Sequence, residues 1–301
     1  MINAYLTELD FYKQYDFDTI YFGGGTPTLM TEKLLESILN KVNCKGEISM
    51  EANPNSISYE KLKNFKTIGV NRLSIGIQSL KDDDLKMLGR IHNREEGIQA
   101  IKNAEKIFKD KYSIDLIYSR PNQNITDWSR ELEQGIALSP YHISAYQLII
   151  ERGTRFSRWK IQEQSEDNQI LLYEKTREIM EKNGLNFYEI SNYAKLGYEC
   201  QHNLVYWKNG EWLGIGAGAH SRINKNGKRY AMQNLKHPQE WLKKVSKKGN
   251  GISVKTKLNI ADITNEKVLM GLRTKEGIDI TGMELNNIAF LEKRKINYGK
   301  K

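Results

Sequence analysis

The sequence has few cysteines and prolines, and each shortage excludes a class of protein. Its two cysteines, Cys44 and Cys200, are far apart and form neither the pairs nor the triplets typical of zinc and iron–sulfur sites. Without a disulfide framework the fold must depend on burial, and 301 residues are enough for one large α/β barrel or for two ordinary domains. So little cysteine also suits a reducing compartment, and we expect a cytoplasmic location.

Long apolar runs are also missing. No stretch approaches the roughly 18 apolar residues of a membrane span, and the N-terminal MINAYLTELDFYKQ lacks the charged and then apolar order of a signal peptide. The 46 Lys and Arg residues exceed the 37 Asp and Glu residues, but the basic residues are scattered except at 293–301. This pattern favours a solvated surface over a nucleic-acid interface. We expect neither a membrane nor a nucleic-acid partner.

Short apolar, β-branched runs alternate with amphipathic stretches through the first half of the chain. Such alternation predicts parallel βα units, as in a partial or full (β/α) barrel. A helix at Ala4–Lys13 comes before the first run, so we expect an α/β barrel that lacks its first strand. The expected strands are Thr19–Phe22, Ile48–Met50, Arg72–Ile77, Ser113–Tyr118 and His142–Leu148. The expected helices are Glu32–Val42 behind Thr31, Tyr59–Ile68 behind Ser58, Glu95–Phe108, and Trp128–Ala137 behind Thr126 and Asp127.

The regular alternation of strands and helices ends in the second half of the chain. A helix is expected at Asn168–Asn183 and a strand at Phe187–Ile190, followed by a loop-rich segment that contains HNLVYWKNGEWLGIGAGAH. Another helix is expected near Asn265–Arg273. The sequence therefore predicts a partial barrel over residues 1–165 and a smaller, loop-rich and helical C-terminal region over residues 166–301.

Polar residues follow or end the expected strands, and barrel enzymes carry their sites at that edge. The first strand runs into Gly23-Gly24-Gly25-Thr26-Pro27, which is either a tight turn or a loop whose N–H groups meet a ligand. Glu51 stands in an otherwise apolar strand, where a buried carboxylate needs a partner. Gln78 and Asp115 are equally readable as polar plugs of the barrel or as ligand contacts. Small, acidic and amide groups thus converge on one rim.

Several segments together carry a family likeness. YFGGGTPTLM, EANPNSIS, GVNRLSIGIQSL, LGRIHN, SIDLIYSRPNQ and HISAYQLIIERGT, in this order, resemble the radical S-adenosylmethionine (SAM) proteins related to oxygen-independent coproporphyrinogen dehydrogenase. The later YEISNYA and HNLVYWKNGEWLGIGAGAHS are similar to the haem-chaperone branch of that family. The resemblance runs from about Asp18 to Gly277. It implies a partial (β/α)6 barrel, SAM as ligand and a 4Fe–4S cluster.

The resemblance also implies roles for individual residues. Gly24, Gly25 and Thr26 match the glycine motif that meets the methionine amino group of SAM, and Glu51 matches the acidic residue beside it. The other residues that match SAM contacts of the family are Gln78, Arg90, as a carboxylate partner, and Asp115, as an acceptor for the ribose hydroxyls.

The HNxxYW motif of the haem-chaperone branch is linked to haem binding, and here it spans His202–Trp207. Imidazole is the usual axial ligand of haem iron, and Tyr206 and Trp207 can cover the macrocycle. We therefore expect His202, in a loop, to bind haem. The alternative is a structural histidine that caps the loop, and His220 is the main rival ligand among the five histidines.

Two departures from the family matter. The C-x3-C-x2-C motif that holds the cluster is absent from the sequence, and neither Cys44 nor Cys200 can replace it. Ser119-Arg120 stands where the family usually has Gly-Leu, which predicts added bulk and charge near SAM. Past Ile278 the likeness fades, so both ends look cut.

These features predict a truncated haem chaperone that binds haem, passes it to client proteins and has no cluster-dependent activity. The alternatives are a fragment of a coproporphyrinogen dehydrogenase and a cluster-free binding protein.

Overall fold

The computed structural model describes residues 2–278, and its first half consists of βα units. Helix α1 leads directly into strand β1, and each later parallel strand follows a helix. The elements are α1 (Ile2–Phe11), β1 (Phe17–Phe22), α2 (Glu32–Leu39), β2 (Cys44–Ala52), α3 (Tyr59–Ile68), β3 (Arg72–Gln78), α4 (Asp82–Met87), α5 (Arg94–Phe108), β4 (Tyr112–Tyr118), α6 (Ile125–Ala137) and β5 (His142–Gln147). All five expected strands are therefore confirmed.

The helix starts follow from capping side chains. The hydroxyls of Thr31 and Ser58 accept hydrogen bonds from backbone N–H groups in the first turns of α2 and α3, as expected. The expected start of α6 was wrong, because Asn124 caps this helix and accepts from the backbone N–H of Asp127 at 2.8 Å. Both Thr126 and Asp127 lie within its first turn.

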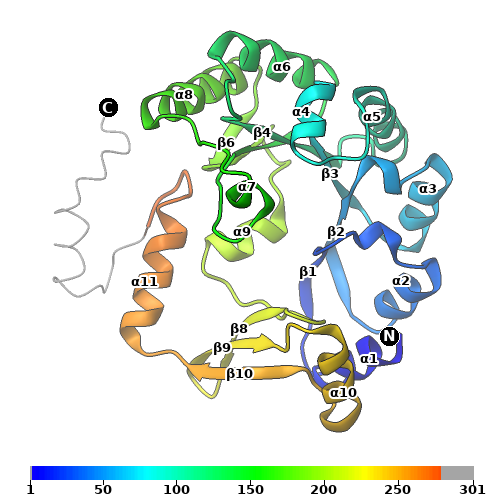
Figure 1. Ribbon diagram of the computed structural model, residues 1–301. Coiled ribbons are helices and arrows are strands. Elements are labelled where there is room, and N and C mark those ends of the chain that lie inside the picture. Colours follow the sequence, from blue (N-terminus) through cyan, green and yellow to red (C-terminus); the bar gives the residue numbers. More distant parts are fainter. Residues whose placement is uncertain (1, 279–301) are drawn as a thin grey trace.

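Within residues 2–278, the main sheet has seven strands in the order β1-β2-β3-β4-β5-β7-β6. Strands β1 to β5 are parallel, whereas β7 (Asn192–Ala194) and β6 (Asn186–Glu189) join antiparallel. The strands follow an arc with helices on its outer side, which confirms the expected partial barrel (Figure 1). The sheet continues beyond residue 165, where the sequence suggested the boundary between two regions.

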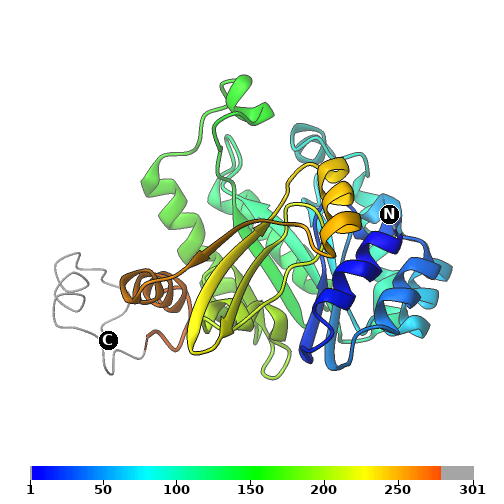
Figure 2. The same cartoon turned by 90° about the horizontal axis from the view of Figure 1, so that it is seen from below.

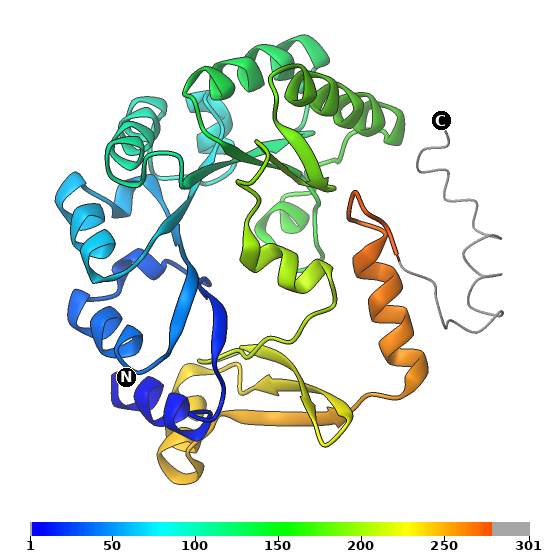
Figure 3. The same ribbon diagram turned by 180° about the vertical axis from the view of Figure 1, so that it is seen from behind.

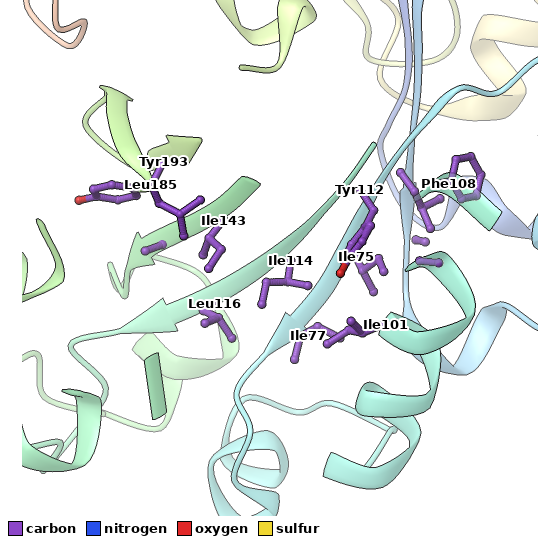
Figure 4. Close-up of a cluster of buried hydrophobic side chains, with 14 of the residues drawn as sticks. Ile75, Ile77, Ile101, Phe108, Tyr112, Ile114, Leu116, Ile143, Leu185 and Tyr193 are labelled. Carbon is purple, nitrogen blue, oxygen red and sulfur yellow. The ribbon is translucent and has the colours of Figure 1, made fainter. Parts of the chain in front are cut away.

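The apolar core lies between the convex side of the sheet and the helices. Ile75 and Ile77 of β3 pack with Ile114 and Leu116 of β4 and with Ile101 of α5, all almost fully buried (Figure 4). Burying each such side chain stabilises the fold by about 1.5–3 kcal/mol. Because side chains alternate along a strand, the residues between them point to the concave side.

The second half adds helices and a smaller sheet. Its elements are α7 (Arg155–Arg158), α8 (Glu166–Lys182), β6, β7, α9 (Gln201–Trp207), β8 (His220–Lys225), β9 (Lys228–Asn234), α10 (Pro238–Lys248), β10 (Ile252–Lys257) and α11 (Ile260–Gly271). The segment around α7 projects from the body (Figure 2). Strands β10, β9 and β8 form an antiparallel sheet that the sequence did not predict. The helical part of the expectation is confirmed by α10 and α11.

A buried carboxylate joins α1 to the small sheet and α10. Glu8 is fully buried, and its oxygens accept hydrogen bonds from the backbone N–H groups of Gly216 and Gly251 at 2.8 and 2.7 Å. Trp241 Nε1 and Asn234 Nδ2 donate to it at 3.0 Å each. Burial still raises the pKa of Glu8, against the lowering effect of these donors. Glu8 therefore helps to fix the small sheet to the start of the barrel, together with the apolar packing of Tyr12 against Ile223 and Met232.

Among residues 2–278, no helix is long and apolar enough to cross a membrane. The expected basic tail at 293–301 lies outside the described residues.

Candidate ligand site inside the barrel

The concave face of the main sheet is polar and forms a cavity of about 310 Å³. This volume lies at the lower end of the range for small-molecule sites, roughly 300–1,000 Å³. Alternate side chains from β2, β3, β4 and β5 contribute to it, as the alternation along parallel strands leads us to expect. The main polar lining residues are Tyr21, Ser49, Glu51, Asn53, Arg72, Ser74, Gln78, Arg90, Ser113, Asp115, His142, Ser144, Tyr146 and Asn203.

The glycine turn after β1 is held by the neighbouring strand. Gly24 and Gly25 have φ angles of +83° and +65°, which glycine adopts without steric cost. The backbone N–H of Gly24 donates to Glu51 Oε2 at 3.2 Å, and Thr26 Oγ1 accepts from Asn53 Nδ2 at 3.2 Å. The turn therefore lies against the end of β2 with its backbone close to a carboxylate.

Two acidic residues face the cavity from different strands. Tyr21 donates its hydroxyl to Glu51 Oε1 at 2.9 Å, and Ser74 donates to both oxygens of Asp115 at 3.0 Å. Burial raises the pKa of Asp115 to about 7, with a further rise from the charge of Glu51 and an opposing effect from Arg90. A cationic ligand would stabilise both carboxylates.

Arg90 and Gln78 complete the rim. Arg90 Nη1 donates to Asn53 Oδ1 at 3.4 Å, and burial lowers the pKa of its guanidinium. Gly76 leaves room for Gln78, because a Cβ at Gly76 would lie 2.9 Å from Gln78 Nε2. An anionic ligand group can thus meet Arg90 while an amide lies near by.

The structure brings the expected SAM residues together. Gly25, Glu51, Gln78, Arg90 and Asp115 line the cavity, and Gly24 and Thr26 contact lining residues. Sequence reasoning missed several other lining residues. Four of them lie two positions from an expected residue, so alternation along the strand would have found them: Ser49, Asn53, Gly76 and Ser113.

The HNLVYW segment is a helix and not the expected loop. It forms α9, which lies inside the arc of the main sheet in both opposite views (Figures 1 and 3). Cys200, at the N-cap, makes no side-chain cap, and Glu47 of β2 takes that role by accepting from the N–H groups of Gln201 and His202 at 3.2 Å each. Arg72 lies 3.6 Å from the same carboxylate.

His202 makes close contacts with two hydroxyl groups and one aromatic ring. Its Nδ1 lies 2.8 Å from Thr19 Oγ1, and its Nε2 lies 2.8 Å from the hydroxyl of Tyr206. The ring stacks on Tyr21 with centroids 5.0 Å apart and planes at 16°. Burial lowers the pKa of His202 to about 4, so the imidazole is neutral at pH 7.

The other histidines have different surroundings. His92 Nε2 contacts the carbonyl of Ile77, and His142 Nε2 contacts the hydroxyl of Tyr188. His220 is exposed at the start of β8, and His237 is the N-cap residue of α10. Among the histidines of the described residues, only His202 combines a half-buried ring with the adjacent Tyr206 and Trp207.

Arg120 was expected to bring charge near SAM. Its guanidinium does not line the cavity, although Nη1 donates to the backbone carbonyl of Gln78 at 3.5 Å. Its side chain is 1% exposed and forms an ion pair with Glu131 of α6, and Asp84 lies 3.1 Å away. Glu131 also accepts from Ser79 Oγ at 2.5 Å. The buried carboxylate of Glu131 therefore neutralises the guanidinium, which lies outside the cavity lining.

The residues of this chain do not fit an iron–sulfur cluster. Cys44 begins β2, whereas Cys200 is buried and donates to Glu47 Oε1 at 3.2 Å. Burial and the charge of Glu47 raise the pKa of Cys200 to about 12, which disfavours the thiolate that iron binds. Within residues 2–278, no group of three His, Cys, Asp or Glu side chains is arranged to hold a metal ion.

Comparisons with known proteins agree with this architecture. The sequence pattern of the radical SAM superfamily matches residues 2–134. The chain is 33% identical to the heme chaperone HemW of Bacillus subtilis over 276 residues, which cover 88% of this chain and 72% of that protein. It is 32% identical to the radical S-adenosyl methionine domain-containing protein 1, mitochondrial, of Danio rerio over 281 residues, covering 89% of this chain and 63% of that protein.

A solved structure supports the fold. Coproporphyrinogen III oxidase (HemN) from Escherichia coli superposes with a TM-score of 0.77 at 21% identity, over 90% of this chain and 68% of that chain. The sequence match to the radical SAM superfamily, together with this fold, identifies the class as radical SAM. More narrowly, the chain belongs to the radical SAM family that includes the HemW heme chaperones. It spans about three-fifths of the length of several of the curated relatives it matches.

Proposed function

We propose that this chain binds SAM in the barrel cavity, binds haem at α9 and passes the haem to client proteins. One observation carries the proposal: the helix with the HNxxYW motif packs directly against the strand that supplies Tyr21 and the glycine turn. The two proposed ligands would then lie on neighbouring parts of one molecule.

The cavity supports SAM binding by charge and shape. Glu51 and Asp115 suit the amine, ribose and sulfonium groups of the ligand, and Arg90 suits its carboxylate. In the family the cluster iron also binds the methionine moiety, and this chain lacks the thiolates for a cluster. Losing a bond of even about 3 kcal/mol weakens affinity by more than a hundredfold, so we propose weak SAM binding.

The state of His202 supports haem binding. A neutral imidazole is the form that binds iron, and the low pKa keeps His202 neutral at physiological pH. Iron must replace the contact between Nε2 and Tyr206 or that between Nδ1 and Thr19. Breaking one hydrogen bond costs about 1 kcal/mol, which an axial bond readily offsets.

Cluster-dependent chemistry is not part of the proposal for this chain. Anaerobic reconstitution of the 301-residue chain with iron and sulfide should give no stoichiometric cluster, because the sequence has two cysteines and Cys200 is buried. Reduction in the presence of SAM should then form no 5′-deoxyadenosine. The unpaired Cys44 and Cys200 suit a reducing compartment, and we propose a cytoplasmic location.

Titrations of SAM and hemin on the same sample test the proposed function. Binding of both ligands supports it, and failure to bind hemin contradicts the haem-chaperone assignment. The enzyme alternative is a coproporphyrinogen dehydrogenase. Its support is the similarity in fold to the solved coproporphyrinogen III oxidase. Decarboxylation of coproporphyrinogen by this chain would replace the proposal with that alternative.

A further inference from the structure

The ring of His202 is fixed on three sides. Thr19 and Tyr206 hold its two nitrogens at 2.8 Å each, and Tyr21 lies parallel to it. Thr19 and Tyr21 are two residues apart on β1, so both point to the same face of the sheet. The helix α9 therefore presses its imidazole against the inward side of β1.

Tyr21 transmits this contact to the glycine turn. Its hydroxyl donates to Glu51 Oε1 at 2.9 Å, and Glu51 Oε2 accepts from the N–H of Gly24 at 3.2 Å. A Cβ at Gly23 would lie 2.8 Å from Tyr21 Cε1 and 3.2 Å from Glu51 Oε1. The tyrosine ring, the carboxylate and the turn thus pack without spare room.

We propose that His202 is a positioning residue for the SAM cavity. By stacking on Tyr21, it holds the tyrosine hydroxyl where it orients Glu51, and Glu51 in turn fixes the glycine turn that faces the ligand. The HNxxYW helix then supports the SAM site in addition to any haem role. This inference rests on the proposed binding of SAM in the cavity.

The alternative is that His202 only stabilises α9. A double-mutant cycle separates the two roles, because a residue that acts through Tyr21 has no further effect once the tyrosine hydroxyl is gone. Tyr21→Phe removes that hydroxyl and leaves the ring on which His202 stacks. If His202 acts through it, the double variant binds SAM no more weakly than Tyr21→Phe alone.

The experiment is calorimetric titration of SAM into the 301-residue chain and its Tyr21→Phe, His202→Ala and double variants. His202→Gln serves as a milder variant, because its amide can reach Thr19 but cannot stack on Tyr21. Each single variant should bind about tenfold more weakly, the loss expected for a hydrogen bond to a charged group. His220→Ala, which changes an exposed histidine on β8, should bind like wild type.

Two results would overturn the inference alone: wild-type affinity in both His202 variants, or independent losses that multiply in the double variant. If wild type itself fails to bind SAM, the proposed SAM site is wrong and the inference falls with it. Circular dichroism checks that each variant is folded before titration.

Discussion

Glu47 on β2 accepts a hydrogen bond from the backbone N–H of His202 on α9, at 3.2 Å, across 155 positions of sequence. The same carboxylate accepts a hydrogen bond from the backbone N–H of Gln201 and lies 3.6 Å from the guanidinium of Arg72. A helix whose N-terminus lacks a cap of its own thus depends on a side chain of the barrel.

Glu47→Ala should therefore destabilise the protein. It removes the acceptor for two helix N–H groups and leaves the nearly buried Arg72 without its counter-charge, which together cost about 3 kcal/mol. Urea unfolding measures the loss, with Glu133→Ala on the exposed side of α6 as control. A loss for Glu47→Ala no larger than for the control would contradict this account.

Glu8→Ala should cost still more, because it removes an acceptor from four buried donors, of which Asn234 Nδ2 alone keeps a second acceptor, the carbonyl of Gly216. These are the N–H groups of Gly216 and Gly251 and the side chains of Trp241 and Asn234. We expect a loss of about 3–5 kcal/mol in urea unfolding. A variant with near wild-type stability would show that water or another group replaces the carboxylate at no cost.

The double change Ser119→Gly and Arg120→Leu restores the residues usual in the family and should weaken the fold. It leaves Glu131 buried without a cation, at a cost of about 3–5 kcal/mol. Adding Glu131→Gln should recover much of that loss, because the amide oxygen can still accept from Ser79. SAM affinity should stay within about twofold, since Arg120 lies outside the cavity lining. A large gain in SAM affinity would instead place Arg120 at the ligand.

SAM affinity should increase with pH between about 5.5 and 7.5. Asp115 has a pKa raised to about 7, so much of it is protonated in the free chain over this range. A cationic ligand favours the carboxylate, so binding releases a proton, and the affinity increases until the free chain is ionised. Calorimetry across the range measures the slope, which Asp115→Asn should remove. A slope unchanged in Asp115→Asn would assign it to another group.

The parallel strands were predictable because the apolar pattern of the strand and the capping residue of the preceding helix agree. Runs such as Arg72–Gln78 are apolar on one side, and helix α3 before that strand starts at a recognisable cap, Ser58. Strand β10 (Ile252–Lys257) was not predictable, because five of its six residues are exposed and it has no buried face to reveal it.

The site likewise has parts that were predictable from local sequence and parts that were not. The strand ends could be placed from sequence, because carboxyl ends of parallel strands meet at one rim. The helical start of the HNLVYW segment could not, because its cap, Glu47, comes from a distant strand. Likewise, the sequence showed the charge of Arg120 but not the partner that neutralises it, Glu131.

Hemin titration of wild type, His202→Ala and His220→Ala tests the central proposal, haem binding at α9, most directly. Wild type and His220→Ala should give the same Soret band and affinity, whereas His202→Ala should lose the axial ligand, shift the band and bind more weakly. Tyr21→Phe should keep the wild-type band, which separates iron ligation from the support of Glu51. Identical spectra and affinities for wild type and His202→Ala would contradict the account, and a loss confined to His220→Ala would place the ligand on β8.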